Sequence, residues 1–227
     1  MTEITVGNLK GGVGKTTTAV LTALGLAAEA EAGDSDDKTL LVSADPQQSA
    51  LKWAHVAGED WPWDRVNVVA WTDHRTLGRQ IESARGEYAH IVVDTPPSRT
   101  RVTRASLEAK TLEAALTATG NLIVTTSPSA IDLAEIADTF EVAEAVDAIR
   151  PVYTSVLVVR VLWSTKSATE APAVLVEDFG YPVMQSRISA REPIAQAFGT
   201  APALTGPFAG YADALTEIHA RHDQQEA

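Results

Sequence analysis

Cysteine is absent from the 227-residue sequence. Its absence excludes disulfides, thiolate metal sites, iron–sulfur ligation and cysteine nucleophiles together. Long apolar runs are absent too, since no stretch approaches the roughly 20 residues that a membrane span requires. The basic and apolar regions of a signal peptide do not follow Met1, which leads directly into the strand-like residues 4–6. We therefore expect a cytoplasmic protein with no membrane partner.

Positive charge is scarce. The sequence has 18 Lys and Arg against 30 Asp and Glu, a formal net charge of −12. Such a chain repels polyanions on average, so any contact with DNA must be a local patch. Five of the acids lie between residues 29 and 37, which we interpret as a solvated loop.

Short β-rich runs alternate with helical patterns along the whole chain, which predicts a parallel sheet wrapped by crossover helices. A length of 227 residues with 45% hydrophobic residues suits one large α/β domain over residues 1–227. The expected strands are 4–8, 39–43, 66–71, 90–93, 121–126, 155–162 and 182–185. The expected helices are 16–30, 47–57, 76–85, 101–117, 131–149, 169–179, 192–198 and 211–222. The predicted fold class is α/β, with a doubly wound, mostly parallel sheet and helices on both faces.

The last expected helix places Tyr211, Leu215, Ile218 and His222 on one face. A membrane-surface helix would carry lysines and arginines opposite such an apolar stripe, whereas this one carries mainly acids. We expect it to pack against the sheet. Core packing is also expected for Trp53, Trp61 and Trp63.

A glycine-rich turn between the first strand and the first helix predicts a phosphate-binding loop. Glycines permit backbone angles that let successive amide groups point at phosphate oxygens, and the helix adds its positive end. Lys15 is expected to reach the β- and γ-phosphates, and Thr16 to offer its hydroxyl to Mg²⁺. The expected nucleotide-binding residues are Gly11, Gly12, Val13, Gly14, Lys15, Thr16 and Thr17.

Two aspartates end other strands of the expected sheet. Phosphoryl transfer to water needs a held metal and a group that orients the water, and carboxylates at the carboxyl ends of strands can supply both. Asp94 ends an apolar strand in the form of a Walker B motif and is expected to hold Mg²⁺ through a water. Asp45 is expected to orient the attacking water and to contribute to the metal site. The chain is therefore expected to be a P-loop NTPase that uses ATP and Mg²⁺.

The run Lys-Gly-Gly-Val-Gly-Lys-Thr-Thr at residues 10–17 resembles the deviant Walker A motif of the ParA/MinD family of ATPases, since Leu9 stands where the strict pattern has glycine. The resemblance implies that Lys10 is a signature lysine that reaches the phosphates of a partner chain in a nucleotide-sandwich dimer. Physically, a second ammonium would neutralise charge on the transferred phosphoryl group. Lys10, Lys15 and Asp45 are thus the expected catalytic residues.

The segment around Asp45 resembles the Asp-Pro-Gln switch I segment of the same family. It departs from the commonest pattern because Ser43 replaces the first aspartate. Hydrolysis is expected to survive, at a rate that the sequence does not predict. A nucleotide-dependent scaffold without hydrolysis is the alternative that Ser43 suggests, and Asp45 argues against it.

Within the family, the missing cysteines exclude the iron–sulfur branch, and no N-terminal helix-turn-helix precedes residue 4. The chain resembles the short ParA class of partition ATPases. That class binds nonspecific DNA as an ATP-bound dimer, which implies nucleoid association, and we expect Arg187 and Arg191 to make the contact. The resemblance also places adenine near Val159-Arg160 and the loop after Gln185. A second cluster, Arg99, Arg101 and Arg104, is expected at the dimer interface or at the nucleotide.

The resulting hypothesis is a ParA-type ATPase that segregates or positions a plasmid, chromosome or other cargo. Its homodimer would form on ATP, and its hydrolysis would be stimulated by DNA and by a ParB-like or other small adaptor protein. One alternative is a small-molecule P-loop enzyme of the dethiobiotin synthetase or amidoligase type, and another is a MinD-like positioning ATPase.

Overall fold

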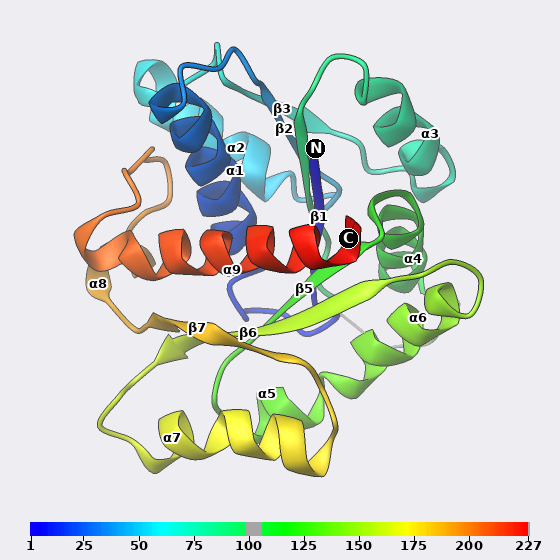
Figure 1. Ribbon diagram of the computed structural model, residues 1–227, viewed down its shortest axis with the longest axis vertical. Helices are drawn as coiled ribbons and strands as arrows, with labels where there is room; N and C mark the ends of the chain where they lie inside the picture. Colours follow the sequence, from blue (N-terminus) through cyan, green and yellow to red (C-terminus); the bar gives the residue numbers. More distant parts are fainter. Residues whose placement is uncertain (99–105, 227) are drawn as a thin grey trace.

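The computed structural model describes the backbone of residues 1–98 and 106–226 and the side chains up to residue 221, apart from 99–105. Strands and helices alternate as the sequence predicts (Figure 1). The strands are β1 (Thr2–Gly7), β2 (Thr39–Ser43), β3 (Val66–Ala70), β4 (His90–Asp94), β5 (Asn121–Thr126), β6 (Tyr153–Val161) and β7 (Val183–Ser189). The α-helices are α1 (Lys15–Ala32), α2 (Ser49–Ala57), α3 (His74–Ala84), α4 (Leu107–Thr119), α5 (Ala130–Ala134), α6 (Ala137–Asp147), α7 (Lys166–Ala173), α8 (Glu192–Ala195) and α9 (Ala209–Glu226).

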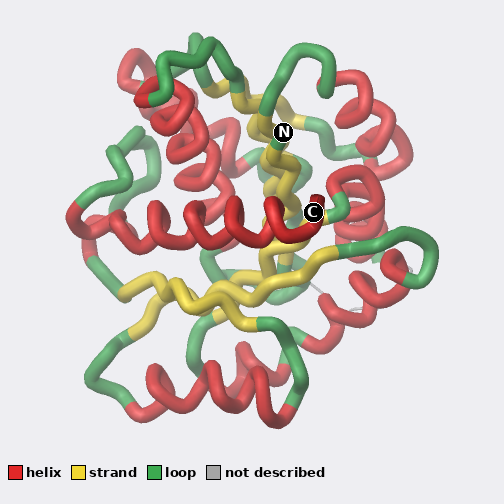
Figure 2. Tube along the Cα trace, viewed as in Figure 1, coloured by secondary structure: helices red, strands yellow, loops and turns green. Residues whose placement is uncertain are grey.

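The seven strands form one sheet in the order β3-β2-β4-β1-β5-β6-β7. Every neighbouring pair is parallel, so the carboxyl ends of all the strands meet at one edge. The expected doubly wound α/β fold is confirmed. Figure 2 shows the twisted sheet running through the middle of the molecule with helices on both sides.

Each face of the sheet has its own core. Side chains of α1, α2 and α9 pack on one face, against strand residues such as Ile4, Leu41 and Val92. On the other face, α3 and α4 cover β2 and β4, while α4, α6 and α7 cover β5 and β6. The central strands are apolar along their length because both faces are covered.

The last helix packs as its apolar stripe predicts. Tyr211 and Leu215 are buried in the same core as α1, and Ile218 packs at its margin. The side chain of His222 lies outside the described ones. In the part of the chain that the structure describes, no helix is both long and apolar enough to cross a bilayer.

Several predicted boundaries are wrong. The segment 131–149 forms two helices, α5 and α6, and the segment 192–198 is helical only over Glu192–Ala195. The last strand does not stop at residue 185 but continues to Ser189. Periodicity could not show this extension, because β7 has register irregularities against β6 and lies at the edge of the sheet.

The tryptophan prediction is correct for two residues of three. Trp53 and Trp61 are 3% and 2% exposed, whereas Trp63 is 40% exposed. Trp63 rests against Trp61 and His55 and donates from Nε1 to the carbonyl of Gly58. It therefore lies outside the core.

Candidate nucleotide-binding site

The glycine-rich loop connects β1 to α1 at the carboxyl edge of the sheet. Gly12 and Gly14 have φ angles of 76° and 80°, which residues with a Cβ rarely adopt. A Cβ on Gly14 would also lie 3.3 Å from the side chain of Val159. Both glycines are thus required by the path of the loop, which ends where α1 begins.

The side chain of Lys15 folds back over this loop. Its Nζ donates to the carbonyl of Lys10 at 2.7 Å, and only 5% of the residue is exposed. Burial lowers the pKa of Lys15 to about 8, against the raising influence of Asp94 and Asp45. The ammonium therefore lies inside the loop, where an anion would replace the solvent that it has lost.

Asp94 lies at the end of β4 beside the start of α1. Its Oδ2 accepts from the Thr16 hydroxyl at 2.8 Å, while its Oδ1 is buried and has no hydrogen-bond partner among the described residues. Burial raises the pKa of Asp94 to about 7, and the hydrogen bond from Thr16 and the charge of Lys15 act in the opposite direction. An unsatisfied buried carboxylate oxygen next to a hydroxyl fits a hard cation such as Mg²⁺ or a water of its shell.

Asp45 follows β2 in a tight turn. Its Oδ1 accepts from the backbone N–H of Gln47 at 2.8 Å, and its carbonyl accepts from Gln48 at 2.7 Å. Gln48 has a φ of 54°, so the turn holds a backbone angle that is uncommon outside glycine. Asp45 is 7% exposed, and its charge acts on both Lys15 and Asp94.

Ser43 lies beside Asp94 in the sheet, since β2 and β4 pair Ser43 with Asp94. The hydroxyl of Ser43 is fully buried and lacks a partner in the described part of the molecule. Side chains alternate along a strand, and Leu41 and Val92, two residues earlier on each strand, belong to the core on the α1 face. Ser43 and Asp94 therefore point to the face that carries Thr16.

A cavity of about 550 Å³ opens beside the loop, within the range of small-molecule pockets. It extends from Gly14 and Thr17 to the end of β6 and the segment after β7. Tyr211 closes it from α9, and burial raises the pKa of that phenol to about 12, so it stays neutral. Val159 and Arg160, the residues expected near adenine, belong to its lining, but the sequence alone did not point to Tyr211.

Comparisons with known proteins agree with this geometry. A family model described as an AAA domain matches residues 1–61. The maintenance of carboxysome distribution protein A of Gloeobacter kilaueensis is 38% identical over 138 residues, which are 60% of this chain and 54% of that protein. The chain thus matches about half of the length of that relative. The protein of the same name from Halothiobacillus neapolitanus is 26% identical over 191 residues, 83% of this chain and 79% of its own length.

Among solved structures, the MinD cell division protein of Aquifex aeolicus aligns with a TM-score of 0.74 and 15% identity, over 97% of this chain and 98% of its own. The chain therefore has the fold of this protein. The run that resembles a deviant Walker A motif forms a loop with the backbone angles and the buried lysine described above.

Lys10, which the resemblance implies to be a signature lysine, turns its ammonium away from the phosphate loop of its own chain. Its Nζ lies 2.6 Å from Glu135 Oε2 and 3.8 Å from Asp132 Oδ1. The hydrogen bond with Glu135 is the main cause that raises the pKa of Lys10, so the ammonium stays charged. Asp132 is in turn bound by the Ser127 hydroxyl at 2.5 Å. No sequence pattern pointed to these acids, because α5 approaches the loop only in the folded chain.

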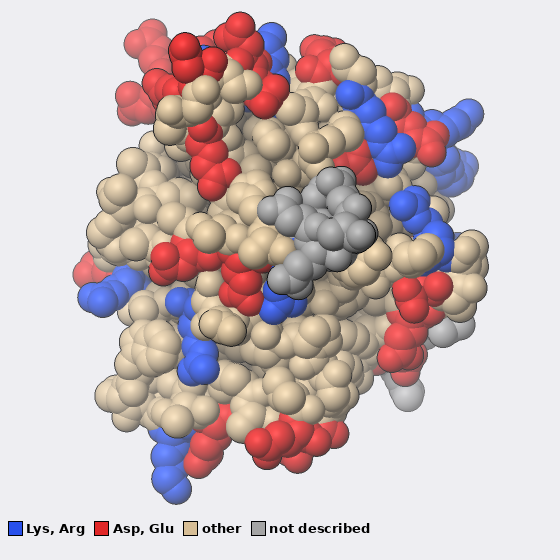
Figure 3. Space-filling model, viewed as in Figure 1, with Lys and Arg blue, Asp and Glu red and all other residues tan. Residues whose placement is uncertain are grey.

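The two arginines expected at the DNA surface have different surroundings. Arg187 lies within β7, is half-buried, donates to the carbonyl of Ala168 and stacks over the ring of Trp163 at 5.7 Å. Arg191 follows the strand and is exposed. Figure 3 shows basic side chains over β7, α8 and the start of α7, while acids gather over the loop after α1. The cluster Arg99, Arg101 and Arg104 lies outside the described residues.

Proposed function

We propose that the chain is a Mg²⁺-dependent ATPase that dimerises around ATP and positions a cargo inside the cell. The observation that carries the proposal is the different placement of two lysine side chains in one loop. Lys15 is buried inside the loop, whereas Lys10 is held outside it by acids of the α5 region. Lys15 can bind the phosphates of the chain's own nucleotide, and Lys10 can contact the nucleotide of a second chain.

The proposed chemistry assigns each group near the loop a separate task. The loop amides and Lys15 bind the phosphates, and Thr16 and Asp94 hold Mg²⁺, which would neutralise phosphate charge and orient the nucleotide. Asp45 orients the attacking water and accepts its proton, with Gln47 fixing the carboxylate. Lys10 of a second copy would stabilise the charge that develops on the transferred phosphoryl group.

Cargo positioning is supported by the names of two relatives, both called maintenance of carboxysome distribution protein A. Plasmid or chromosome segregation remains an alternative cargo for the same cycle. In either case we infer that the ATP-bound dimer binds nonspecific DNA through Arg191 and its neighbours, and that an adaptor protein stimulates hydrolysis. Hydrolysis would release the protein from DNA. Repeated binding and release would then let the protein position its cargo on the nucleoid.

The test combines light scattering with a phosphate-release assay on the purified chain. With Mg²⁺ and ATP we expect a dimer and slow turnover that DNA accelerates, and with ADP a monomer. Lys10→Ala should bind ATP as the parent does but neither dimerise nor hydrolyse. Turnover by a monomer at the parental rate in Lys10→Ala would disprove the role of the second chain. Turnover that requires a carboxylate substrate would instead support an amidoligase.

A further inference from the structure

The two edge strands of the sheet differ in whether their outward backbone groups have hydrogen-bond partners. At β7, the backbone N–H groups of Gln185 and Ser186 donate to the carboxylate of Glu217, both at 3.0 Å. The carbonyl of Val183 accepts from Arg221 at 3.3 Å, and β7 carries register irregularities. Side chains of α9 thus satisfy outer backbone groups of Val183, Gln185 and Ser186, and the irregular register discourages a further strand.

The opposite edge, β3, has no such cover among the described residues. The N–H of Thr39 on β2 donates to the carbonyl of Arg65, and in a parallel ladder this means that Asn67 and Val69 also turn their backbone groups toward β2. Val66, Val68 and Ala70 turn theirs outward. The outward groups of Val66 are satisfied by Pro62 and by the indole of Trp61.

The outward backbone groups of Val68 and Ala70 differ from those of Val66. Within the ranges 1–98 and 106–226, no hydrogen bond to their outward backbone groups is found. The strand Val-Asn-Val-Val-Ala has no charge and no proline, and its register with β2 is continuous. It therefore has none of the features by which edge strands avoid pairing, apart from its length of five residues.

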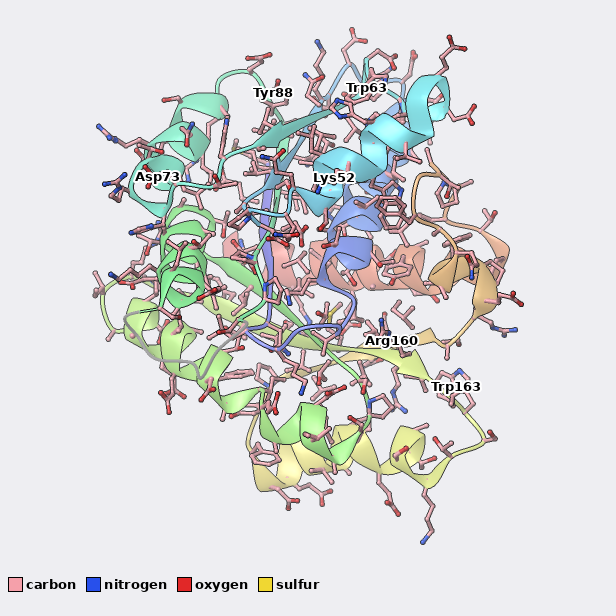
Figure 4. The ribbon with its side chains drawn as sticks, turned by 180° about the vertical axis from the view of Figure 1, so that it is seen from behind. Lys52, Trp63, Asp73, Tyr88, Arg160 and Trp163 are labelled. Atoms are coloured by element: carbon pink, nitrogen blue, oxygen red, sulfur yellow. The ribbon has the colours of Figure 1, made fainter. Side chains whose placement is uncertain are left out.

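A cleft of about 620 Å³ lies directly beside this edge, between β3 and α3. Val69, Trp71 and Tyr88 form its partly exposed apolar wall and pack on the core beneath α3. Arg79, Gln80 and Glu87 are among the polar residues at its margin. In Figure 4, Asp73 marks the start of α3 and Tyr88 follows its far end, with β3 on the outside between α3 and α2.

We propose that β3 and this cleft form a docking site for an extended segment of a partner protein. The segment would add to the sheet as an eighth strand, hydrogen-bonded to Val68 and Ala70. Its alternate side chains would point to the α3 side, where a bulky apolar side chain fits between Trp71 and Tyr88. Backbone pairing would supply affinity, and the cleft would supply specificity.

A second copy of the chain is a poorer occupant. A five-residue strand spans about 17 Å, and pairing two such edges buries far less than the roughly 1,200 Å² of a stable interface. The proposed site lies away from the phosphate loop, so it would be available with or without nucleotide.

The test uses the ¹⁵N-labelled full chain and the peptide acetyl-Thr-Phe-Thr-Phe-Thr-amide. On titration we expect the amide signals of Val68 and Ala70 to shift and their hydrogen exchange to slow. The same peptide N-methylated at every residue should not bind, whichever direction it runs along β3. Trp71→Ala should weaken binding about tenfold or more, as loss of a buried aromatic anchor does. The matched control is Trp63→Ala, which removes an exposed tryptophan outside the cleft and should leave peptide affinity unchanged.

Val68→Pro provides the edge-specific variant, because it removes an outward donor and no donor to β2. It should abolish peptide binding. Unchanged signals of Val68 and Ala70, or equal weakening by the two tryptophan variants, would overturn the proposal. Concentration-dependent protection of these amides without peptide would assign the edge to a second copy and also overturn it. ATP affinity, measured on the same samples, should not change with Trp71→Ala, so failure here is separable from failure of the ATPase proposal.

Discussion

The ammonium of Lys10 lies 2.6 Å from a carboxylate oxygen of Glu135 in the same chain. Both side chains are partly exposed, at 24% and 46%, so water screens the pair and it is readily broken. In the proposed dimer, Lys10 must leave Glu135 to reach the other nucleotide. The ion pair therefore competes with dimerisation.

The first prediction follows from this competition. Glu135→Gln should favour the ATP-bound dimer, lowering the protein concentration of half-dimerisation by at most about 30-fold, because two exposed pairs, each worth about fivefold or less, break per dimer. Light scattering against protein concentration measures this. The control is Glu141→Gln, an exposed acid on α6 that is not paired with Lys10, and it should leave dimerisation as it is. A weaker dimer in Glu135→Gln would show that Glu135 assists Lys10 in the assembled state.

A second prediction concerns pH. Burial raises the pKa of Asp94 from 3.8 to about 7, so between these values the folded protein binds more protons than the unfolded one. The free energy of unfolding should then fall as pH rises through this window, by at most about 1.4 kcal/mol per pH unit from this group. Asp94→Asn should remove this contribution.

His90 contributes with the opposite sign, because burial lowers its pKa below 6.5. Below that value the unfolded state binds the extra proton, so stability rises with pH. Since His90 is present in both proteins, the difference between the parent and Asp94→Asn isolates the aspartate. Denaturant unfolding without nucleotide, over about pH 4 to 8, provides the two curves. Parallel curves would mean that Asp94 is already ionised in the folded state at low pH.

The third prediction tests the cavity beside the loop. Ala190 is exposed and belongs to its lining, so Ala190→Trp should fill it and reduce ATP and ADP affinity about tenfold or more, as overpacking of a fitted site does. Ala148→Trp, at the exposed end of α6, is the matched control. Calorimetric titration with each nucleotide compares them. Equal affinities in both variants would place the base elsewhere.

A fourth prediction separates the two arginines after β6. Arg191→Ala should weaken DNA binding by the ATP-bound protein and reduce the slope of log affinity against log salt by about 0.9 for each phosphate that the variant no longer neutralises. Arg187→Ala should lower the unfolding temperature as well, because Arg187 is packed against Trp163 and Ala168. Arg75→Ala, which removes an arginine paired with Asp73, should leave the slope unchanged.

The fifth prediction concerns Ser43. Ser43→Asp adds a carboxylate beside Asp94, and two buried like charges disfavour each other's ionised form. The variant should lose about 1–3 kcal/mol of stability, and Mg²⁺ with ADP should restore most of it. Ser43→Ala removes a hydroxyl that has no partner among the described residues and should change stability by less than about 1 kcal/mol. Thermal unfolding with and without Mg²⁺ and ADP measures both, and an equal loss in the two conditions would place residue 43 outside the metal's reach.

The sequence alone determined the class of fold and the phosphate loop. Alternating strand and helix patterns specify a parallel sheet, and the run from Lys10 to Thr17 needs no tertiary contact to be identified, because glycine spacing and a helix start are local properties. Asp45 and Asp94 could be placed at the same edge, since parallel strands end together.

The tertiary structure decided everything that depends on distant segments. Lys10 and Glu135 lie far apart in the sequence, and no periodicity relates them; α5 brings the acid to the loop. Tyr211 reaches the cavity only because α9 packs across α1. Trp63 is exposed because the turn after α2 places it outside the core. Backbone groups at the outer edge of β7 have partners because α9 lies beside that strand, whereas no helix side chain bonds to the described edge of β3. The sequence could not show this difference, because Glu217 and Arg221 are distant from β7 along the chain.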